Sequence, residues 1–271
     1  MRSLEQIEQW PSEHAAAAVV RADGTVAGSH GDTARPFRLA SVTKLLTAYS
    51  ALIAIEEGVV ELDTPAGPEG STVRHLLAHT AGLGFDSDRV MARPGTRRMY
   101  SNAGFAVLAD ALTEHSGIPF ADYLSEALLA PLGMSATRLE GSPGAGGVST
   151  VDDLMRFAAE LQAPKLLDPA TVTAATSVAF PGLSGVLPGL GHQKPNDWGL
   201  GFEIRDHKSP HWTGSDSSPR TFGHFGQSGT FLWADPDAGA ACVVLTDLDF
   251  GPWAIEAWPP FTDAVLAELR G

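Results

Sequence analysis

The strongest constraint on the fold of this 271-residue chain comes from one stretch, Ser41–Gly58, which is apolar on almost every side when it is read as a helix. Large apolar residues recur there at helical spacing and alanines fill the positions between them: Leu45, Leu46, Tyr49, Leu52, Ile53, with Ala48, Ala51 and Ala54. A helix that is apolar all round is buried among other elements. Because the chain is long enough to bury a sizeable core, we expect a globular protein with this helix inside it.

Short apolar segments typical of strands lie near both ends of the chain, and helical patterns fill the middle. Strands are expected at 15–20, 25–27, 199–204, 221–226, 230–233 and 240–246, the first two forming a hairpin that turns at Asp23-Gly24. Helices are expected at 4–10, 71–80, 104–115, 120–128 and 149–161, with a loop over 181–198 and a last helix after Pro259-Pro260. This order predicts an α+β fold whose sheet is completed by both termini. We expect residues 1–60 and 199–271 to form the sheet domain and 61–198 a mainly helical domain.

The charge balance restricts the partners of the chain. It has 18 Lys and Arg against 32 Asp and Glu, a formal net charge of −14. Such a surface repels phosphate backbones and anionic lipids, so we expect no nucleic-acid and no membrane partner. The first residues, 1–8, carry acids where a secretory signal would be apolar, and Leu45–Ile55 is too short to span a bilayer. We therefore expect a cytoplasmic protein, acting as a monomer, in which the single cysteine, Cys242, is a core residue.

Ser41-Val42-Thr43-Lys44 opens the buried helix and is the first candidate for chemistry. The i, i+3 spacing places the Ser41 hydroxyl and the Lys44 amine on one face of the helix. A serine nucleophile needs a base, and lysine serves only when neutral; burial and the helix N-terminus both disfavour its ammonium form. With four lysines in the chain, this spacing arises by chance in roughly one such chain in four. The alternative is a helix-capping serine followed by a surface lysine, but a buried helix is a poor place for an idle charge.

Tyr100-Ser101-Asn102 is a more specific signal, because the chain has only three tyrosines and two asparagines. A Tyr-x-Asn triplet therefore arises by chance about once in fifty such chains. It lies where a loop enters a helix, so the phenol could relay protons and the amide could bind both Lys44 and a substrate carbonyl. The alternative is an asparagine cap beside a packed tyrosine.

His224-Phe225-Gly226-Gln227 lies on an expected strand near the C-terminal end. A polar residue followed by Gly226 suits a strand edge along which a substrate can lie. By itself the segment also fits an ordinary glycine-rich strand.

In this order, Ser41-x-x-Lys44, Tyr100-x-Asn102 and His224-x-Gly226 resemble the three catalytic elements of the serine penicillin-recognising enzymes. This superfamily comprises β-lactamases, DD-peptidases and related esterases, and the chain is most similar to its class C β-lactamase branch, with the family VIII esterases. The resemblance runs from about Val19 to Asp247. Three further segments also match the family: His75–Leu83, Pro131–Met134 and Gly146–Leu154. It implies an antiparallel sheet flanked by helices, an inserted all-helical domain and an active site between them.

The resemblance also implies roles for these residues. Ser41 matches the acylated nucleophile, Lys44 its activating amine, and Tyr100 the residue that deprotonates Ser41 and later the deacylating water. Asn102 matches the residue that orients Lys44 and the substrate amide.

The resemblance places the third motif, His224-x-Gly226, on the strand that borders the implied site. His224 stands where the family has Lys or His on the strand bordering the site. The oxyanion hole implied by the resemblance consists of the backbone N–H groups of Ser41 and Gln227. No cofactor and no metal is expected.

Two departures from the family bear on the substrate. Phe225 occupies a position where members active on β-lactams usually have a hydroxyl residue that helps bind the drug's carboxylate, and the chain is shorter than usual. With the expected cytoplasmic location, these features favour an esterase on small esters or amides, acting through a Ser41 acyl-enzyme. β-Lactam or D-Ala-D-Ala peptide hydrolysis, acyl transfer to an acceptor other than water, and a non-catalytic ligand-binding descendant are the alternatives.

Three other patterns are set aside. His75 and His79 have a zinc-compatible spacing, but residue 76 is Leu where a metalloprotease motif needs Glu, so a structural helix end is the better interpretation. Gly141–Gly147 lacks the spacing of a nucleotide-binding loop. A basic cluster precedes Tyr100, and we expect it to be solvated, with attraction of an acidic substrate as the alternative: Arg93, Arg97 and Arg98.

Overall fold

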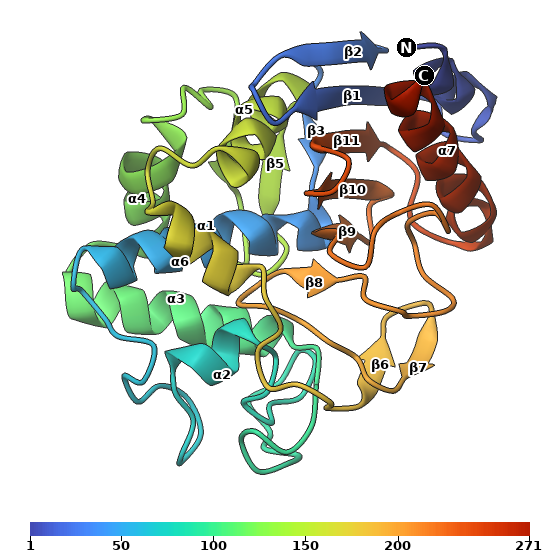
Figure 1. Ribbon diagram of the computed structural model, residues 1–271. Coiled ribbons are helices and arrows are strands. Elements are labelled where there is room, and N and C mark those ends of the chain that lie inside the picture. The colour runs from blue at the N-terminus through green and yellow to red at the C-terminus, as the bar shows by residue number, and fades with distance from the viewer.

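Strands from both ends of the chain form one six-stranded antiparallel sheet, as the sequence and the resemblance predict (Figure 1). The computed structural model describes all residues, 1–271. The strand order is β2-β1-β11-β10-β9-β8, so the hairpin at the start of the chain pairs with its last strand. The bounds are β1 Ala15–Arg21, β2 Val26–His30, β8 Glu203–Ile204, β9 Phe222–Gly226, β10 Thr230–Asp235 and β11 Ala240–Thr246.

The middle of the chain is mainly helical and lies to one side of the sheet (Figure 1). Its helices are α1 Thr43–Glu56, preceded by the 3-10 turn η2 Ala40–Val42, then α2 Val73–Leu77, α3 Asn102–Ser116, α4 Phe120–Leu124 with the π-turn η3 Ser125–Leu129, α5 Val151–Gln162 and α6 Pro169–Ala175. Short strands connect them, in a three-stranded sheet β3 Phe37–Arg38, β5 Gly147–Ser149, β4 Arg138–Leu139, and in a hairpin β6 Gly185–Leu187, β7 Gly191–Gln193.

Both faces of the large sheet are buried, which explains why its central strands are apolar without alternation. Along β1, Ala16 and Ala18 pack with the helices of the middle of the chain, whereas Ala17 and Val19 pack with the last helix, α7 (Pro252–Arg270). Helix α5 packs on β1 and β11, and the N-terminal 3-10 helix η1 (Arg2–Gln9) packs beside α7. Cys242 of β11 is fully buried, which confirms it as a core residue.

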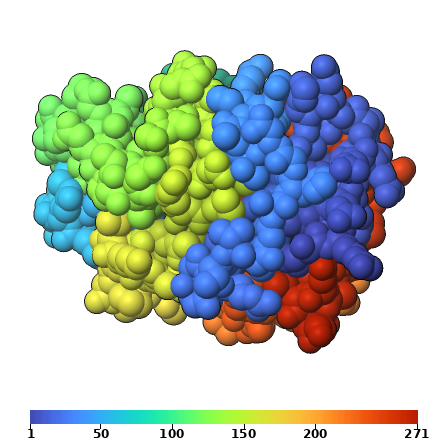
Figure 2. All heavy atoms as spheres, turned by 90° about the horizontal axis from the view of Figure 1, so that it is seen from above, coloured from blue at the N-terminus to red at the C-terminus, as the bar shows by residue number.

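The start and the end of the chain lie side by side (Figures 1 and 2). The backbone N–H and the hydroxyl of Ser3 donate to the Glu268 carboxylate of α7 at 2.8 and 2.7 Å. Leu4 and Ile7 of η1 are buried in the same cluster as Trp258 of α7. One face of the sheet is therefore covered by both ends of the chain together.

The last helix begins earlier than the sequence predicts. We expected it to follow Pro259-Pro260, but α7 begins at Pro252 and continues through both prolines. Trp258 and Phe261 on either side of them are fully buried against the sheet. Their packing outweighs the missing N–H groups of the prolines, because tertiary contacts supply most of the stability of a helix in a protein. No helix of the chain combines the length and the apolar character that crossing a bilayer requires.

Three other boundaries differ from the prediction. The helix expected at 71–80 ends at Leu77, where the N–H of Thr80 returns to the carbonyl of His75 at 2.8 Å. The strand expected at 199–204 shrinks to β8, because the N–H of Gly199 donates to the carbonyl of Phe202 and closes a turn. The loop expected at 181–198 contains the β6–β7 hairpin.

The division into domains at residues 60 and 199 stays a prediction. Helix α5 lies within the 61–198 segment and packs on the sheet, whereas α1 lies within the 1–60 segment and packs against α3 and α4.

Candidate active site

Ser41 lies in η2, directly before the buried helix α1, and strand β9 packs against this turn. The residue before it, Ala40, has φ of 45°, in the left-handed region that alanine rarely adopts. The hydroxyl of Thr230 donates to the carbonyl of Leu39 at 2.8 Å, and that of Ser228 donates to the carbonyl of Arg38 at 2.6 Å. These contacts fix the backbone before Ser41 to the β9–β10 turn, so the unusual conformation of Ala40 is held by its surroundings.

Lys44, on the first turn of α1, is fully buried and contacts the Ser41 hydroxyl, as the spacing predicts. Its Nζ lies 3.2 Å from Ser41 Oγ, 2.5 Å from Asn102 Oδ1 and 2.7 Å from the carbonyl oxygen of Gly144. All three partners are neutral. Burial without a carboxylate partner lowers the pKa of Lys44 to about 7, against a smaller opposing effect of Asp86.

Tyr100 contacts the Ser41 hydroxyl as well, in addition to Lys44. Its hydroxyl donates to Ser41 Oγ at 2.6 Å, and its ring lies 4.6 Å from Lys44 Nζ. Burial raises the pKa of the Tyr100 phenol, although the hydrogen bond to Ser41 acts in the opposite direction. The phenol therefore stays protonated near neutral pH.

Asn102 is the first residue of α3, and the preceding Ser101 caps this helix by accepting the N–H of Gly104 at 2.9 Å. The capping role that was the alternative for Asn102 thus belongs to Ser101. The Asn102 carbonyl oxygen accepts from Lys44, and its amide donates to Asp86 at 2.8 Å. The second motif therefore contacts the first through two hydrogen bonds, Tyr100 to Ser41 and Lys44 to Asn102.

The third motif lies on β9 and in the turn after it. His224 is 3% exposed, and its ring lies 5.6 Å from the Tyr100 ring. Gly226 ends the strand, and Gln227 follows it with a backbone N–H that donates to no carbonyl. That free N–H is the property that an oxyanion hole requires.

A cavity of about 70 Å³ joins the three motifs. Its lining combines the hydroxyl-bearing residues of the first two motifs, residues of the third motif, the carboxylate-bearing residue of β8 and apolar residues around them: Ser41, Tyr100, His224, Phe225, Gln227, Glu203, Phe85, Leu187, Pro188 and Trp198. Phe225 both lines this cavity and packs on Phe250 at 4.8 Å between ring centres. The space beside Ser41 is thus small and largely apolar.

Sequence reasoning missed several of the residues that build this site. The carbonyl of Gly144 accepts from Lys44, and it lies in the glycine-rich segment 141–147, whose sequence carries no sign of this contact. Trp198 packs against the rings of Tyr100 and His224 at 5.8 and 5.3 Å. The rarity of tryptophan near a Gly-rich loop was the only available signal for it. Asp86 contacts Asn102 from an exposed loop that carries no motif.

A buried ion pair borders the cavity. Glu203 of β8 is paired with Lys208, and its other oxygen accepts from His211 Nε2 at 2.9 Å and Trp212 Nε1 at 3.0 Å. Burial would raise the pKa of Glu203, but Lys208 and His211 together hold it well below its usual value. Glu203 is therefore a fully paired carboxylate.

The basic cluster differs from its prediction at one residue. Arg93 and Arg97 are exposed, as expected of solvated residues. Arg98 is 2% exposed and donates to the backbone carbonyls of Ala78, Ala179, Phe180 and Asn196. It braces three loops against each other and is not available to attract a substrate.

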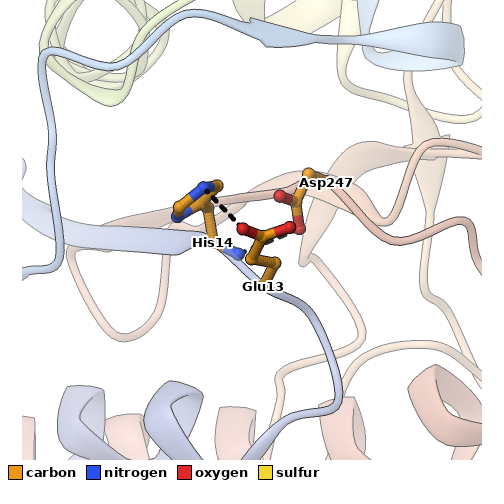
Figure 3. A group of neighbouring side chains, drawn as sticks. All are labelled: Glu13, His14 and Asp247. Atoms are coloured by element: carbon orange, nitrogen blue, oxygen red, sulfur yellow. Dashed lines mark hydrogen bonds and ion pairs between the residues drawn. The ribbon is translucent and has the colours of Figure 1, made fainter.

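The two histidines with zinc-compatible spacing do not share a helix face. His75 lies on α2 with Nδ1 2.9 Å from the Thr72 hydroxyl, whereas His79 lies beyond the helix and accepts the N–H of Ser101 at 3.2 Å. Another group with potential ligand atoms lies at the ends of β1 and β11: Glu13, His14 and Asp247 (Figure 3). The N–H of His14 donates to the Asp247 carboxylate at 3.0 Å, a contact that extends the strand pairing, and we assign no metal to it.

Two stretches of the chain, residues 5–143 and 138–265, match a family model described as Beta-lactamase. The chain belongs to the beta-lactamase family. The crystal structure of a beta-lactamase from Mycobacterium bovis is 61% identical, with a TM-score of 0.97, and the match covers 98% of this chain and 99% of that one.

Curated relatives match only in part. Penicillin-binding protein 4* of Bacillus subtilis is 29% identical over 136 residues, which are 38% of this chain and 30% of the relative. The D-alanyl-D-alanine-carboxypeptidase/endopeptidase AmpH of Escherichia coli is 28% identical over 193 residues, which are 47% of this chain and 50% of the relative. The matches thus span half or less of these relatives. Within the family, the chain is a hydrolase of the serine beta-lactamase and penicillin-binding protein type.

Proposed function

We propose that the chain is an esterase that forms an acyl-enzyme on Ser41. The observation that carries the proposal is the convergence of Lys44 Nζ and Tyr100 OH on Ser41 Oγ, at 3.2 and 2.6 Å. A serine hydroxyl flanked by an amine whose pKa is lowered to about 7, so that a large share of it is neutral near pH 7, and by a protonated phenol is the arrangement that nucleophilic catalysis needs. A non-catalytic, ligand-binding descendant of the family would not need to keep Ser41, Lys44 and Tyr100 together.

In the first half-reaction, Ser41 Oγ attacks the ester carbonyl carbon and its proton passes to neutral Lys44. The oxyanion is held by the N–H groups of Ser41 and Gln227. When the tetrahedral intermediate collapses, the C–O bond to the alcohol breaks and the alkoxide takes the Tyr100 proton. The Lys44 ammonium then gives its extra proton to the phenolate, so that both groups return to their starting forms. The resemblance implies that Tyr100 deprotonates Ser41, but we propose Lys44 for this role. The lowered pKa of Lys44, about 7, leaves free amine available near neutral pH, whereas burial raises the pKa of Tyr100 and keeps the phenol protonated.

In the second half-reaction, water attacks the acyl carbon and gives its proton to the same Lys44–Tyr100 pair. The bond to Ser41 Oγ then breaks and Ser41 regains a proton. The net reaction is ester plus water to acid plus alcohol, with the enzyme unchanged.

The walls of the site favour small esters. Phe225 replaces the hydroxyl residue that would help to hold a drug's carboxylate, and the cavity beside Ser41 is about 70 Å³. Phe85, Leu187 and Pro188 give it an apolar entrance. The second candidate is β-lactam hydrolysis, which is favoured by the name of the 61% identical Mycobacterium bovis protein.

Intact-mass spectrometry separates these candidates. The protein is incubated with a fluorophosphonate, a small p-nitrophenyl ester or a penicillin, alongside Ser41→Ala and, as a matched control, Ser177→Ala, an exposed serine that donates to the carbonyl of Thr173. We expect a fluorophosphonate adduct and ester turnover in the native protein and in Ser177→Ala, and neither in Ser41→Ala. Rapid penicillin turnover would favour the β-lactamase instead, and a stable penicillin adduct a peptidase. Absence of any adduct or turnover would rule out the acyl-enzyme.

A further inference from the structure

The hydrogen-bonding polarity of His224 follows from its contacts. Nδ1 of His224 lies 2.6 Å from the backbone carbonyl oxygen of Phe225. A carbonyl oxygen only accepts, so Nδ1 must carry the proton in this bond. In the neutral ring the other nitrogen, Nε2, then presents a lone pair.

That lone pair has no partner. His224 Nε2 is buried and forms no hydrogen bond, although the residue lines the cavity beside Ser41. The two polar groups on the neighbouring rings are engaged elsewhere: Tyr100 OH donates to Ser41, and Trp198 Nε1 donates to the side-chain oxygen of Asn196 at 3.3 Å. A buried acceptor without a donor costs free energy that a donor on a bound molecule recovers.

Burial keeps His224 neutral. Burial lowers its pKa to about 3, and the adjacent Lys44 acts in the same direction. The carbonyl of Phe225 and the carboxylate of Glu203 act in the opposite direction. The effect of Glu203 is the smallest of the four, and its carboxylate is itself paired with Lys208.

We propose that His224 Nε2 accepts a hydrogen bond from an uncharged N–H or O–H group of the substrate, and so determines substrate specificity. The inference deepens the proposed function and rests on it: the substrates are esters whose acyl chain carries an amide N–H or a hydroxyl a few carbons away from the scissile carbonyl. A carboxylate in that place would set two acceptors against each other in a buried site, with no cation offered by the third motif. A volume of about 70 Å³ holds roughly two water molecules, which suits a small donor group.

The test uses a series of p-nitrophenyl monoesters of glutaric and adipic acid. At each chain length the far end is a primary carboxamide, an N,N-dimethylcarboxamide or a carboxylate, and kcat/KM is measured in about 1 M salt, where the Debye length is about 3 Å and the net charge of the protein is screened. At one or both lengths we expect the carboxamide to exceed the dimethylamide about tenfold, the value of one additional hydrogen bond. The carboxylate should be the poorest of the three.

Variants assign the preference to His224. His224→Phe keeps the aromatic ring without its nitrogens and should bring the carboxamide-to-dimethylamide ratio to about one. His207→Phe, at a histidine whose side chain is 83% exposed, should leave the ratio as it is in the native protein. ¹⁵N NMR of the native protein at neutral pH gives an independent readout, in which we expect the Nδ1–H tautomer at His224.

The outcomes separate this inference from the proposed function. If no ester is turned over and none acylates Ser41, the proposed function fails. If the esters are turned over but the ratio is near one at both chain lengths, or the carboxylate is the best substrate, the specificity role of His224 is wrong. An imidazolium or an Nε2–H tautomer in the NMR spectrum would overturn it as well, even if His224→Phe does not fold.

Discussion

At the scale of single residues, two buried lysines illustrate how surroundings decide chemistry. Lys44 and Lys208 are 0% and 4% exposed. Lys208 is paired with the Glu203 carboxylate, whereas Lys44 contacts only neutral oxygens. A buried ammonium without a counter-charge is destabilised relative to the amine. Of the two, only Lys44 is thus set up to act as a base.

This arrangement predicts the pH dependence of the reaction. Neutral Lys44 is the active form, and its pKa is lowered to about 7. With a neutral ester, kcat/KM should fall about tenfold per pH unit below that value and reach a plateau above it. Asp86→Asn should move the midpoint to lower pH, because the negative charge of Asp86 raises the pKa of Lys44. The measurement is a pH–rate profile of initial velocities at low ester concentration.

Asp88→Asn serves as the control, since Asp88 is exposed two residues away on the same loop. Its midpoint should match that of the native protein. A profile that is flat, or that falls, between about pH 6 and about pH 8 would contradict the role of Lys44 as the base.

The proximity of the residues that we propose to carry the chemistry was predictable, because their types are rare and their spacing is local. Ser41 and Lys44 share a helix turn, and Tyr100 and Asn102 share a helix start, so short motifs fix their geometry. The carbonyl of Gly144 was not predictable, because any residue has a carbonyl and only the path of the chain brings it to Lys44.

At the scale of elements, the site depends on how closely strand β9 approaches the turn η2. A Cβ atom at Gly226 would lie 2.2 Å from the carbonyl oxygen of Leu39 and 2.6 Å from the hydroxyl of Thr230. Only a glycine permits this contact. Gly226, which the sequence suggested as part of a substrate-binding edge, therefore also sets the distance between the strand and Ser41.

Gly226→Ala should consequently lower kcat/KM by about a hundredfold or more, since displacing a reacting group by about 1 Å can cost that much. The strand must move away from Leu39 to admit the methyl group. The readout is ester turnover per folded molecule, with folding checked by circular dichroism.

Gly117→Ala is the matched control. Gly117 ends α3 with φ of 73°, and a Cβ there would meet nothing within 4 Å. We expect it to cost about 1–2 kcal/mol of stability through its left-handed backbone while leaving turnover unchanged. Native turnover in Gly226→Ala would show that the close approach is dispensable.

The type of most elements was predictable, whereas several boundaries were not. The buried helix, the first hairpin and strand β11 follow from apolar patterns that local sequence contains. The continuous helix α7 does not, because its stability across Pro259-Pro260 comes from contacts with distant strands. Contacts with the sheet, rather than helix propensity, determine where α7 begins.

At the scale of the whole molecule, one side of the sheet depends on both ends of the chain. Helix η1 reaches α7 across the full length of the sequence, and Leu4 is 0% exposed between them. A residue so near the start of a chain is usually of little consequence to stability. Here it is a core residue, and its contacts connect the two ends.

Leu4→Ala should therefore lower the free energy of unfolding by about 2–5 kcal/mol, as expected for a cavity in a packed core. Ile255→Ala, at a side chain on α7 that is 40% exposed, should cost about 0.5 kcal/mol. Urea unfolding measures both, with the slope of the transition unchanged if only stability is affected. Equal effects of the two substitutions would argue against a core closed by η1.

The fully buried thiol of Cys242 on β11 can report local opening of the folded protein. Burial raises the pKa of this thiol, and β1 and β10 flank it on either side. Its side chain lies in the apolar cluster that η1 and α7 cover. A thiol reagent reaches it only when this cover opens, so the labelling rate of the native chain gives the free energy of that opening without any engineered probe. The same shielding means that an acyl group captured on the folded protein is not held by sulfur.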